Sequence, residues 1–270
     1  MRVTIYQPRY FPQLHYFNRI LNSDTFVLLD SAQYTKSLIH LTKVGKERHS
    51  SYQSDTPIKL SSGHYSLTVP IKHNGLLPIN KTQIDYSHKW VSNHQGVIKS
   101  AYSKGKSFDN LFTQVREILL KKYDTLAELD TATIIWGISS VLRLGMDCKD
   151  LTLEELNRRL SKTKNIRLKK VLYSSEINAQ RPSGLQKGAE WTIAICQNLG
   201  ATEYYHGATA KDSYMELEDY KKKGVIPITQ DWQGIEYGQQ FRDKTGFISN
   251  LSILDLLFNA DQKEALKIIL

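Results

Sequence analysis

The sequence lacks the residues that build several common kinds of site. Its two cysteines, Cys148 and Cys196, are too few for a disulfide framework, and neither lies at metal-ligand spacing from a second cysteine or a histidine. The eight histidines form no His-x-x-x-His pair, so the sequence predicts no zinc site. The chain also has neither the glycine-rich loop of dinucleotide-binding and P-loop proteins nor the Gly-x-Ser-x-Gly turn of many serine hydrolases.

Long apolar runs are missing as well. No segment has the roughly 18 consecutive apolar residues that a membrane helix needs. Thr4, Gln7 and Arg9 interrupt the stretch where the apolar region of a secretory signal would lie. The 270 residues contain no internal repeat and no low-complexity linker. We therefore expect a cytoplasmic protein without a membrane span.

The positive charge is concentrated in the first half of the chain. Residues 1–130 hold 17 Lys and Arg against 10 Asp and Glu, a net charge of +7, whereas residues 131–270 hold 19 against 17, a net charge of +2. A basic half favours an anionic partner such as a nucleotide, a sugar phosphate, RNA or a membrane surface. The alternative is a lysine-rich surface that only aids solubility.

The apolar pattern predicts an α/β fold. Residues 2–7 read as a strand, residues 14–21 as a short helix and residues 24–30 as a buried parallel strand. Strand and helix patterns alternate again through the last third of the chain, where we expect strands at 169–177, 202–207 and 224–232 and helices at 187–199, 213–223 and 252–269. This alternation is typical of a mostly parallel sheet with flanking helices and a Rossmann-like core.

The middle of the chain follows a different pattern. Residues 37–64 are polar and read as irregular, and residues 65–72 and 79–86 are expected to pair as an antiparallel β-hairpin at the sheet edge. Helical patterns follow at 108–123 and 130–144, and Thr152 with Glu155 has the spacing of a capping box. We expect one α/β domain over residues 1–270, with a helical insertion at 87–165.

The loop Gln7–Pro12 follows the first strand and is the first candidate site. Ligands of open α/β sheets bind at the carboxyl ends of strands, where this loop is expected to lie. Gln7 and Arg9 offer hydrogen bonds, and Tyr10 offers a ring for stacking. The alternative is a rigid connection, fixed by its prolines, with Tyr10 and Phe11 packed beneath it.

A second polar loop follows the second strand. Asp30, Gln33, Tyr34 and Lys36 lie there, and the two loops are expected to be neighbours. An acid at the carboxyl end of a strand can contact a sugar hydroxyl or act as a general base. Alternatively, Asp30 is a turn or capping residue.

Further candidates lie outside these two loops. A basic and aromatic cluster suits phosphate binding with base or sugar stacking, with a solvated helix face as the alternative; it consists of His88, Lys89, Trp90, Tyr102, Lys104 and Lys106. His88 is its candidate for acid–base chemistry. Weaker candidates for substrate contact are Ser174, Ser175, Gly207, Tyr237 and Gln239.

These segments together resemble the WbqC-like family, bacterial proteins associated with O-antigen lipopolysaccharide and other surface-polysaccharide biosynthesis. The resemblance covers nearly the whole chain and rests on "YQPRYFPQLHYFNRILNSDTFVLLDSAQYTK", "LTVPIK", "YSSEI", "CQNLGATEYYHGATAKDSY" and the ending "YGQQF…LSILDLLFN". Two positions depart from the family pattern. Tyr6 stands where the family usually has His, and Thr42-Lys43 lies near the position of an Asn-Arg pair. A mechanism that needs an imidazole at position 6 is therefore in doubt.

The resemblance implies a transferase that attaches an acyl or aminoacyl group, glycyl for example, to the amine of a nucleotide-linked amino sugar. Asp30 or His88 would remove the amine proton, and Arg9, Lys36 and Lys104 would bind the diphosphate. The donor would be an activated acyl or aminoacyl group, and tRNA would be a partner if that donor were an aminoacyl-tRNA.

Two other functions stay open at this point. The first loop is also similar to the phosphate-gripping loop of nucleotidylyltransferases, which would imply a nucleoside triphosphate substrate. A non-catalytic RNA- or ligand-binding protein is the third hypothesis, although the sequence has no standard RNA-binding signature. The apolar end of the chain either closes the core or pairs two subunits in a homo-oligomer.

Overall fold

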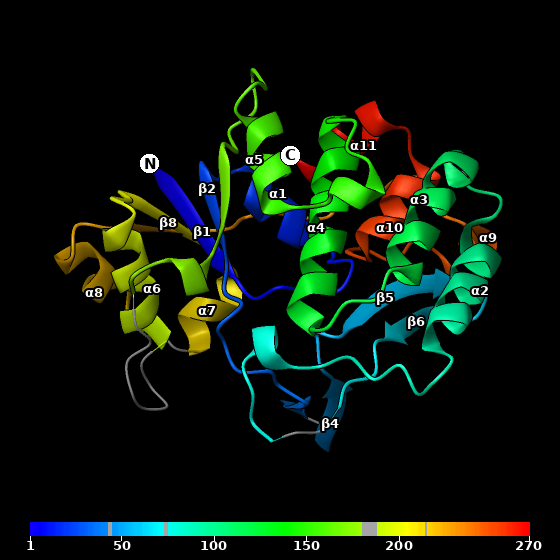
Figure 1. The fold of residues 1–270 in the computed structure, drawn as a ribbon, viewed down its shortest axis with the longest axis horizontal. Helices are drawn as coiled ribbons and strands as arrows, with labels where there is room; N and C mark the ends of the chain where they lie inside the picture. Colours follow the sequence, from blue (N-terminus) through cyan, green and yellow to red (C-terminus); the bar gives the residue numbers. More distant parts are fainter. Residues whose placement is uncertain (43–44, 73–74, 180–187, 214) are drawn as a thin grey trace.

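The chain folds around a five-stranded parallel sheet. The computed structural model describes residues 1–42, 45–72, 75–179, 188–213 and 215–270; for residues 37–42, 45–50, 211–213 and 262 it describes the backbone only. The strands lie in the order β7-β2-β1-β8-β9, and Figure 1 shows the central three, β2, β1 and β8, side by side. Their bounds are Arg2–Tyr6 for β1, Thr25–Leu28 for β2, Lys170–Tyr173 for β7, Glu203–His206 for β8 and Ile226–Thr229 for β9. The predicted α/β fold is confirmed.

The first strand and helix form because their apolar residues match the local geometry. Val3 and Ile5 of β1 are buried, and β1 pairs in parallel with β2 from Val3 opposite Thr25 to Tyr6 opposite Leu28. Helix α1 (Leu14–Leu21) packs against this pair, and the Tyr16 ring lies 5.7 Å from the Phe26 ring of β2. Strand β8 then joins the other side of β1.

Helices occupy the segments between the later strands. Helices α6 (Gly188–Asn198), α7 (Ala208–Ser213) and α8 (Leu217–Lys222) accompany β8 and β9. The Tyr220 ring of α8 stacks on the Tyr204 ring of β8 at 5.3 Å. At the end of the chain the predicted single helix at 252–269 is divided into α10 (Ile253–Asn259) and α11 (Gln262–Ile269). The division falls where the Asp261 side chain caps α11 by accepting from the backbone N–H groups of Lys263 and Glu264.

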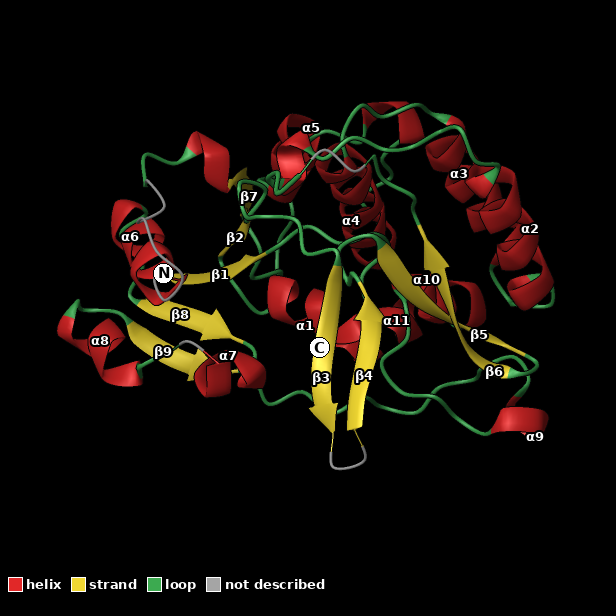
Figure 2. Ribbon diagram, turned by 90° about the horizontal axis from the view of Figure 1, so that it is seen from below, coloured by secondary structure: helices red, strands yellow, loops and turns green. Residues whose placement is uncertain are grey.

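Two antiparallel hairpins stand outside the parallel sheet (Figure 2). They are β3 (Ser37–Thr42) with β4 (Gly45–Ser50), and β5 (Asp55–Leu60) with β6 (Gly63–Thr68). The expected hairpin of 65–72 with 79–86 is reduced to one antiparallel bridge, between Ile71 and Ile84, because Gly63–Thr68 pairs with β5 instead. Residues Ile79–Lys81 form a short 3₁₀-helix, η1, because the N–H groups of Ile79 and Asn80 donate to the backbone of Ala32 and Asp30 instead.

The segment between β6 and β7 is mainly helical, as the sequence predicts, and α2, α3, α4 and α10 lie together at the right of Figure 1. The helices of this segment are α2 (Trp90–Tyr102), α3 (Phe108–Leu120), α4 (Leu126–Leu142) and α5 (Leu153–Leu160), and the short 3₁₀-helix η2 (Cys148–Asp150) lies between α4 and α5. A second 3₁₀-helix, η3 (Ser174–Glu176), follows β7. The four-residue helix α9 (Arg242–Thr245) comes after β9. Helix α4 begins four residues earlier than expected because Thr125 and Glu128 form a capping box. Whether residues 87–165 are an insertion in one domain stays a prediction. Among the described helices, none is long and apolar enough to cross a bilayer.

Candidate functional site

The strand order places a ligand-binding edge beside β1. Numbered by their order in the chain, the five strands run 3-2-1-4-5, with β1 in the centre. In such sheets the connections leave β1 in opposite directions, and ligands bind in the crevice at the carboxyl ends of the two strands where this reversal occurs. Here those strands are β1 and β8. The loop that begins at Gln7 and the turn at Gly207 both lie at this edge.

Tyr6, Arg9 and Arg19 form the central group at this edge, which we call the Arg–Tyr cluster. The Arg9 guanidinium carbon lies 4.5 Å from the centre of the Tyr6 ring, and Arg9 Nη2 donates to the Tyr6 hydroxyl at 2.5 Å. The Arg19 guanidinium carbon lies 4.4 Å from the same ring. One tyrosine therefore lies between two cations, one from the loop after β1 and one from α1.

Arg19 is held in this position by the strands on the far side of β1. It is 5% exposed, and its Nε and Nη2 donate to Oε1 of Gln230 at 3.0 and 2.9 Å. Gly207 gives it room, since a Cβ at that position would lie 2.5 Å from Arg19 Nη2. The close neighbour of Gly207 is therefore a guanidinium, and its contact with a substrate stays a prediction.

The loop after β1 is fixed by side chains from the segment before β5. Gln7 Oε1 accepts from the Tyr52 hydroxyl and from Gln53 Nε2, both at 2.8 Å. The Tyr52 ring lies 4.3 Å from the Arg9 guanidinium carbon, so Arg9 is sandwiched between Tyr52 and Tyr6. Arg9 Nε is buried and has no hydrogen-bond partner among the described residues. The loop thus presents a rigid, incompletely satisfied guanidinium.

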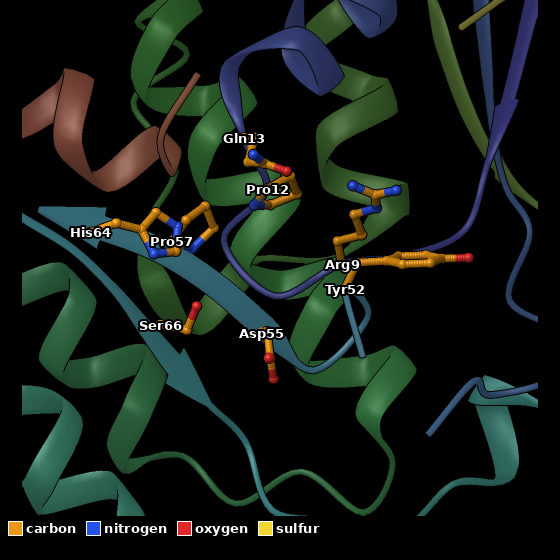
Figure 3. A pocket seen from close by; sticks show the side chains of 8 residues that line it. All are labelled: Arg9, Pro12, Gln13, Tyr52, Asp55, Pro57, His64 and Ser66. Carbon is orange, nitrogen blue, oxygen red and sulfur yellow. The ribbon is translucent and has the colours of Figure 1, made fainter. Parts of the chain in front are cut away.

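A hollow of about 220 Å³ opens beside Arg9 (Figure 3). Figure 3 shows Arg9 and Tyr52 at one end and His64 with Pro57 at the other. The remaining lining residues are Pro12, Gln13, Asp55 and Ser66. This wall mixes hydrogen-bonding groups with apolar rings, which suits a polar ligand with a ring such as a sugar or a nucleoside.

Positive charge dominates the cluster. None of the ion pairs found among the described residues involves Arg9 or Arg19. Asp130 of α4 is fully buried, and burial raises the pKa of its carboxyl well above the usual range although Arg9 lowers it, so it offsets the arginines less than an exposed carboxylate would. Two guanidinium groups that are not in ion pairs are typical of a site for an anion.

The same charge changes the titration of two neighbours. Burial alone would raise the pKa of Tyr6, but Arg9 and Arg19 outweigh it and lower the pKa below that of a free tyrosine. Burial together with Arg9 and Arg19 lowers the pKa of His15 to about 3, although its hydrogen bond with Asn250 raises it. His15 is therefore neutral near pH 7.

Asp30 lies at the neighbouring strand end and has a full set of hydrogen bonds. Its Oδ1 accepts from the Ser174 hydroxyl at 2.9 Å and the Ser175 N–H at 3.0 Å, and its Oδ2 accepts from the Ser175 hydroxyl at 2.6 Å and Asn80 Nδ2 at 2.9 Å. Asp30 is 3% exposed. It ties η1 and η3 to the end of β2, and its predicted role as a general base stays a prediction.

The other residues predicted for the two loops divide between core and surface. Tyr10 is fully buried, and its hydroxyl lies 3.0 Å from His94 Nδ1, so it packs beneath the loop with Phe11, as the alternative interpretation expected. Gln33 and Lys36 have exposed side chains in the loop after β2.

The remaining candidates lie away from the cluster. His88 is exposed near the start of α2 and pairs with Asp85 at 3.6 Å, and Lys104 is exposed between α2 and α3. Tyr237 and Gln239 are buried in a separate network, in which the Tyr237 hydroxyl donates to Asp255 and Gln239 Nε2 donates to the Tyr237 hydroxyl. The structure therefore brings Gln7, Arg9 and Gly207 together and leaves these four elsewhere.

Sequence reasoning missed Arg19 and His15, and it mentioned Tyr6 only as a departure from a pattern. Arg19 carries no local signal, because it reads as a polar residue of a short amphipathic helix and becomes buried only when β8 and β9 return beside β1. Within the described residues, no three His, Cys, Asp or Glu side chains gather in a way that could hold a metal ion.

Comparisons with known proteins give one family and one distant relative. The model of the WbqC-like protein family matches residues 7–267. The chain is 26% identical over 260 residues to Rv1507c of Mycobacterium tuberculosis, a protein described as uncharacterized, and the match covers 96% of this chain and 93% of that protein. No solved structure matches the chain.

Proposed function

Because this chain belongs to the WbqC-like protein family, we propose that it is an enzyme of surface-polysaccharide biosynthesis that transfers an acyl or aminoacyl group to the amine of a nucleotide-linked amino sugar. The family supports the pathway only in outline. The reaction and the substrate class are our proposal, argued from the chemistry of the Arg–Tyr cluster.

The observation that carries the proposal is the pair of arginines at the carboxyl ends of β1 and β8, neither of which is in an ion pair found among the described residues. A nucleotide-linked sugar has a diphosphate with two negative charges, and guanidinium groups bind phosphate oxygens with paired N–H donors. Arg9 is held by flanking rings and Arg19 by Gln230, so little side-chain entropy remains to be lost on binding. Both features favour a diphosphate as the ligand.

The hollow beside Arg9 supports the rest of the substrate. His64, Ser66, Gln13 and Asp55 line it and can hydrogen-bond sugar hydroxyl or amine groups. The site has no glycine-rich cradle, so the diphosphate would be bound by side chains more than by backbone N–H groups. An activated acyl donor would approach the amine from the open side of the same hollow.

Binding is the first test. Titration calorimetry with UDP- and dTDP-linked amino sugars should give saturable binding that Arg9→Gln weakens about 10- to 100-fold, the loss expected for one charged hydrogen-bonding group. Arg158→Gln removes a guanidinium from an exposed ion pair on α5 and is the matched control, with unchanged affinity. Equal affinity in the wild-type and Arg9→Gln proteins would remove the cluster from the binding site.

The reaction is tested by mass spectrometry on the bound sugar incubated with acyl esters, thioesters and aminoacyl-tRNA. An amide product identifies the transfer and the donor. Release of pyrophosphate from a nucleoside triphosphate, with no amide, would replace the proposal by nucleotidyl transfer. Affinity for any RNA that falls steeply with salt, without affinity for the sugar, would replace it by RNA binding.

A further inference from the structure

Within the Arg–Tyr cluster, Tyr6 is the side chain that can release a proton, because guanidinium groups stay protonated. Its hydroxyl accepts a hydrogen bond from Arg9 Nη2, and among the described residues no acceptor lies within hydrogen-bonding distance of its own O–H. The residue is partly exposed at the carboxyl end of β1, whereas Tyr10 and Tyr16, which follow it, are buried. A hydroxyl that is oriented by a cation and still has its donor available is placed to act on a ligand.

We infer that the Tyr6 hydroxyl is the proton-transfer group of this site and that its ionisation is coupled to anion binding by Arg9 and Arg19. The proton-transfer role rests on the proposed function, because that function supplies the reaction. The coupling between Tyr6 ionisation and anion binding rests only on the geometry of the cluster.

The other candidates for acid–base chemistry fit this role less well. The Asp30 carboxylate already accepts four hydrogen bonds. His88 lies on the surface beside α2, with its side chain 70% exposed. His15 has a pKa of about 3 and is too weak a base to accept a proton near pH 7. Tyr6 lies between the two groups that would bind the diphosphate.

The step balances within the proposed reaction. The amine nitrogen bonds to the carbonyl carbon of an acyl ester, and the carbon–oxygen bond to the leaving alcohol breaks. The Tyr6 phenol gives its proton to the departing alcohol oxygen, and the resulting phenolate takes the proton that the nitrogen loses. The products are an amide and an alcohol, and Tyr6 ends in the state in which it began.

The surroundings of Tyr6 set the direction of the coupling. The charged groups that face it are Arg9 from the loop and Arg19 from α1; Tyr16 lies 4.9 Å away ring to ring, and His15 of the same helix is neutral. The two arginines favour the phenolate. An anion bound to them offsets their charge, so it raises the pKa of Tyr6, and by reciprocity an ionised Tyr6 weakens anion binding.

The test is an ultraviolet titration of tyrosinate with three proteins: wild type, Tyr6→Phe, and Tyr65→Phe as a control for the same change at an exposed position on β6. Tyr6→Phe keeps the ring that contacts both arginines. We expect one tyrosine in the wild type to ionise at lower pH than the others. This step is absent in Tyr6→Phe, present in Tyr65→Phe, and moved to higher pH by inorganic pyrophosphate. Superimposable titrations of wild type and Tyr6→Phe would overturn the inference.

Turnover gives the second readout. With the sugar and donor found by mass spectrometry, Tyr6→Phe should lower kcat roughly 100-fold or more and change KM less than twofold, since proton transfer contributes at least that factor and the binding groups remain. Full turnover in Tyr6→Phe refutes the proton-transfer role. If the wild type acylates no sugar, the proposed function fails, while the pyrophosphate-dependent titration still decides the coupling.

Discussion

Gly207→Ala tests the packing of the cluster most directly. The added Cβ would lie 2.5 Å from Arg19 Nη2, 3.1 Å from its guanidinium carbon and 3.3 Å from Nη1. A carbon needs roughly 3.5 Å from its neighbours, so the guanidinium must move by about 1 Å. That movement breaks the two hydrogen bonds, of 3.0 and 2.9 Å, to Gln230.

The size of the effect follows from what is lost. A hydrogen-bonded contact of a charged group contributes about 1.5 to 3 kcal/mol, so we expect Gly207→Ala to lower the free energy of unfolding by about 2 kcal/mol. For a chain of this size the melting temperature falls by about 4 to 8 °C. Because Arg19 also leaves the Tyr6 ring, affinity for pyrophosphate should fall in parallel.

A double-mutant cycle with Arg19→Ala isolates the cause. Gly207→Ala should cost close to zero in the Arg19→Ala background, which gives a coupling free energy of about 2 kcal/mol. Gly238→Ala is the control, because a Cβ there meets no atom within 4 Å. The free energies come from urea denaturation followed by circular dichroism. Equal costs of Gly207→Ala in both backgrounds would refute the argument that Arg19 requires this glycine.

Three further predictions concern the scaffold. Asp30→Asn replaces one of the two accepting oxygens by an NH₂ group, which then faces two hydrogen-bond donors, so urea denaturation should show a loss of about 3 kcal/mol. A loss under about 1 kcal/mol would contradict the role of Asp30 in tying η1 and η3 to β2. Burial lowers the pKa of His94 to about 4, although its hydrogen bond to the Thr68 carbonyl raises it. Because the unfolded imidazole titrates near 6.5, the free energy of unfolding is highest above that pH and falls by about 2 kcal/mol on going to pH 5. Denaturation measured across this pH range should show that His94→Gln removes the loss. Gly137→Ala puts a Cβ 2.5 Å from Cζ of the buried Phe17, so calorimetry should record a lower melting temperature, and an unchanged one would show that this ring can move aside.

The local hydrophobic pattern was sufficient to predict the helices and strands that bury one continuous apolar stripe. Strand β1, helix α1 and strand β2 lie where periodicity placed them, and α1 begins and ends at the expected residues. Residues 79–86 show how the same reasoning fails. Ile79 and Ile84 are buried like the inward residues of a strand, but Ile79 belongs to a 3₁₀-helix and Ile84 meets Ile71 in a single bridge.

The sequence was sufficient to select the loop residues of the candidate site, but not the distant residues that contact Arg19. Gln7 and Arg9 follow a strand, and the rule for open α/β sheets is sufficient to select them. The importance of Arg19 depends on Gly207 and Gln230, which lie about 190 and 210 residues away along the chain. Nothing in the sequence near Arg19 encodes that contact, because it exists only once the strand order is fixed.

The central position of β1 has a consequence for synthesis on the ribosome. Strand β1 precedes the other strands of the sheet, and one of its two neighbours, β8, is synthesised only about 200 residues later, as the hydrogen bond from Thr4 to Tyr205 shows. At 5 to 20 residues per second the emerging strand waits roughly 10 to 40 seconds with one edge unpaired. During that interval α1 cannot bury Arg19 against Gln230, so the Arg–Tyr cluster is complete only after Gln230 has been synthesised.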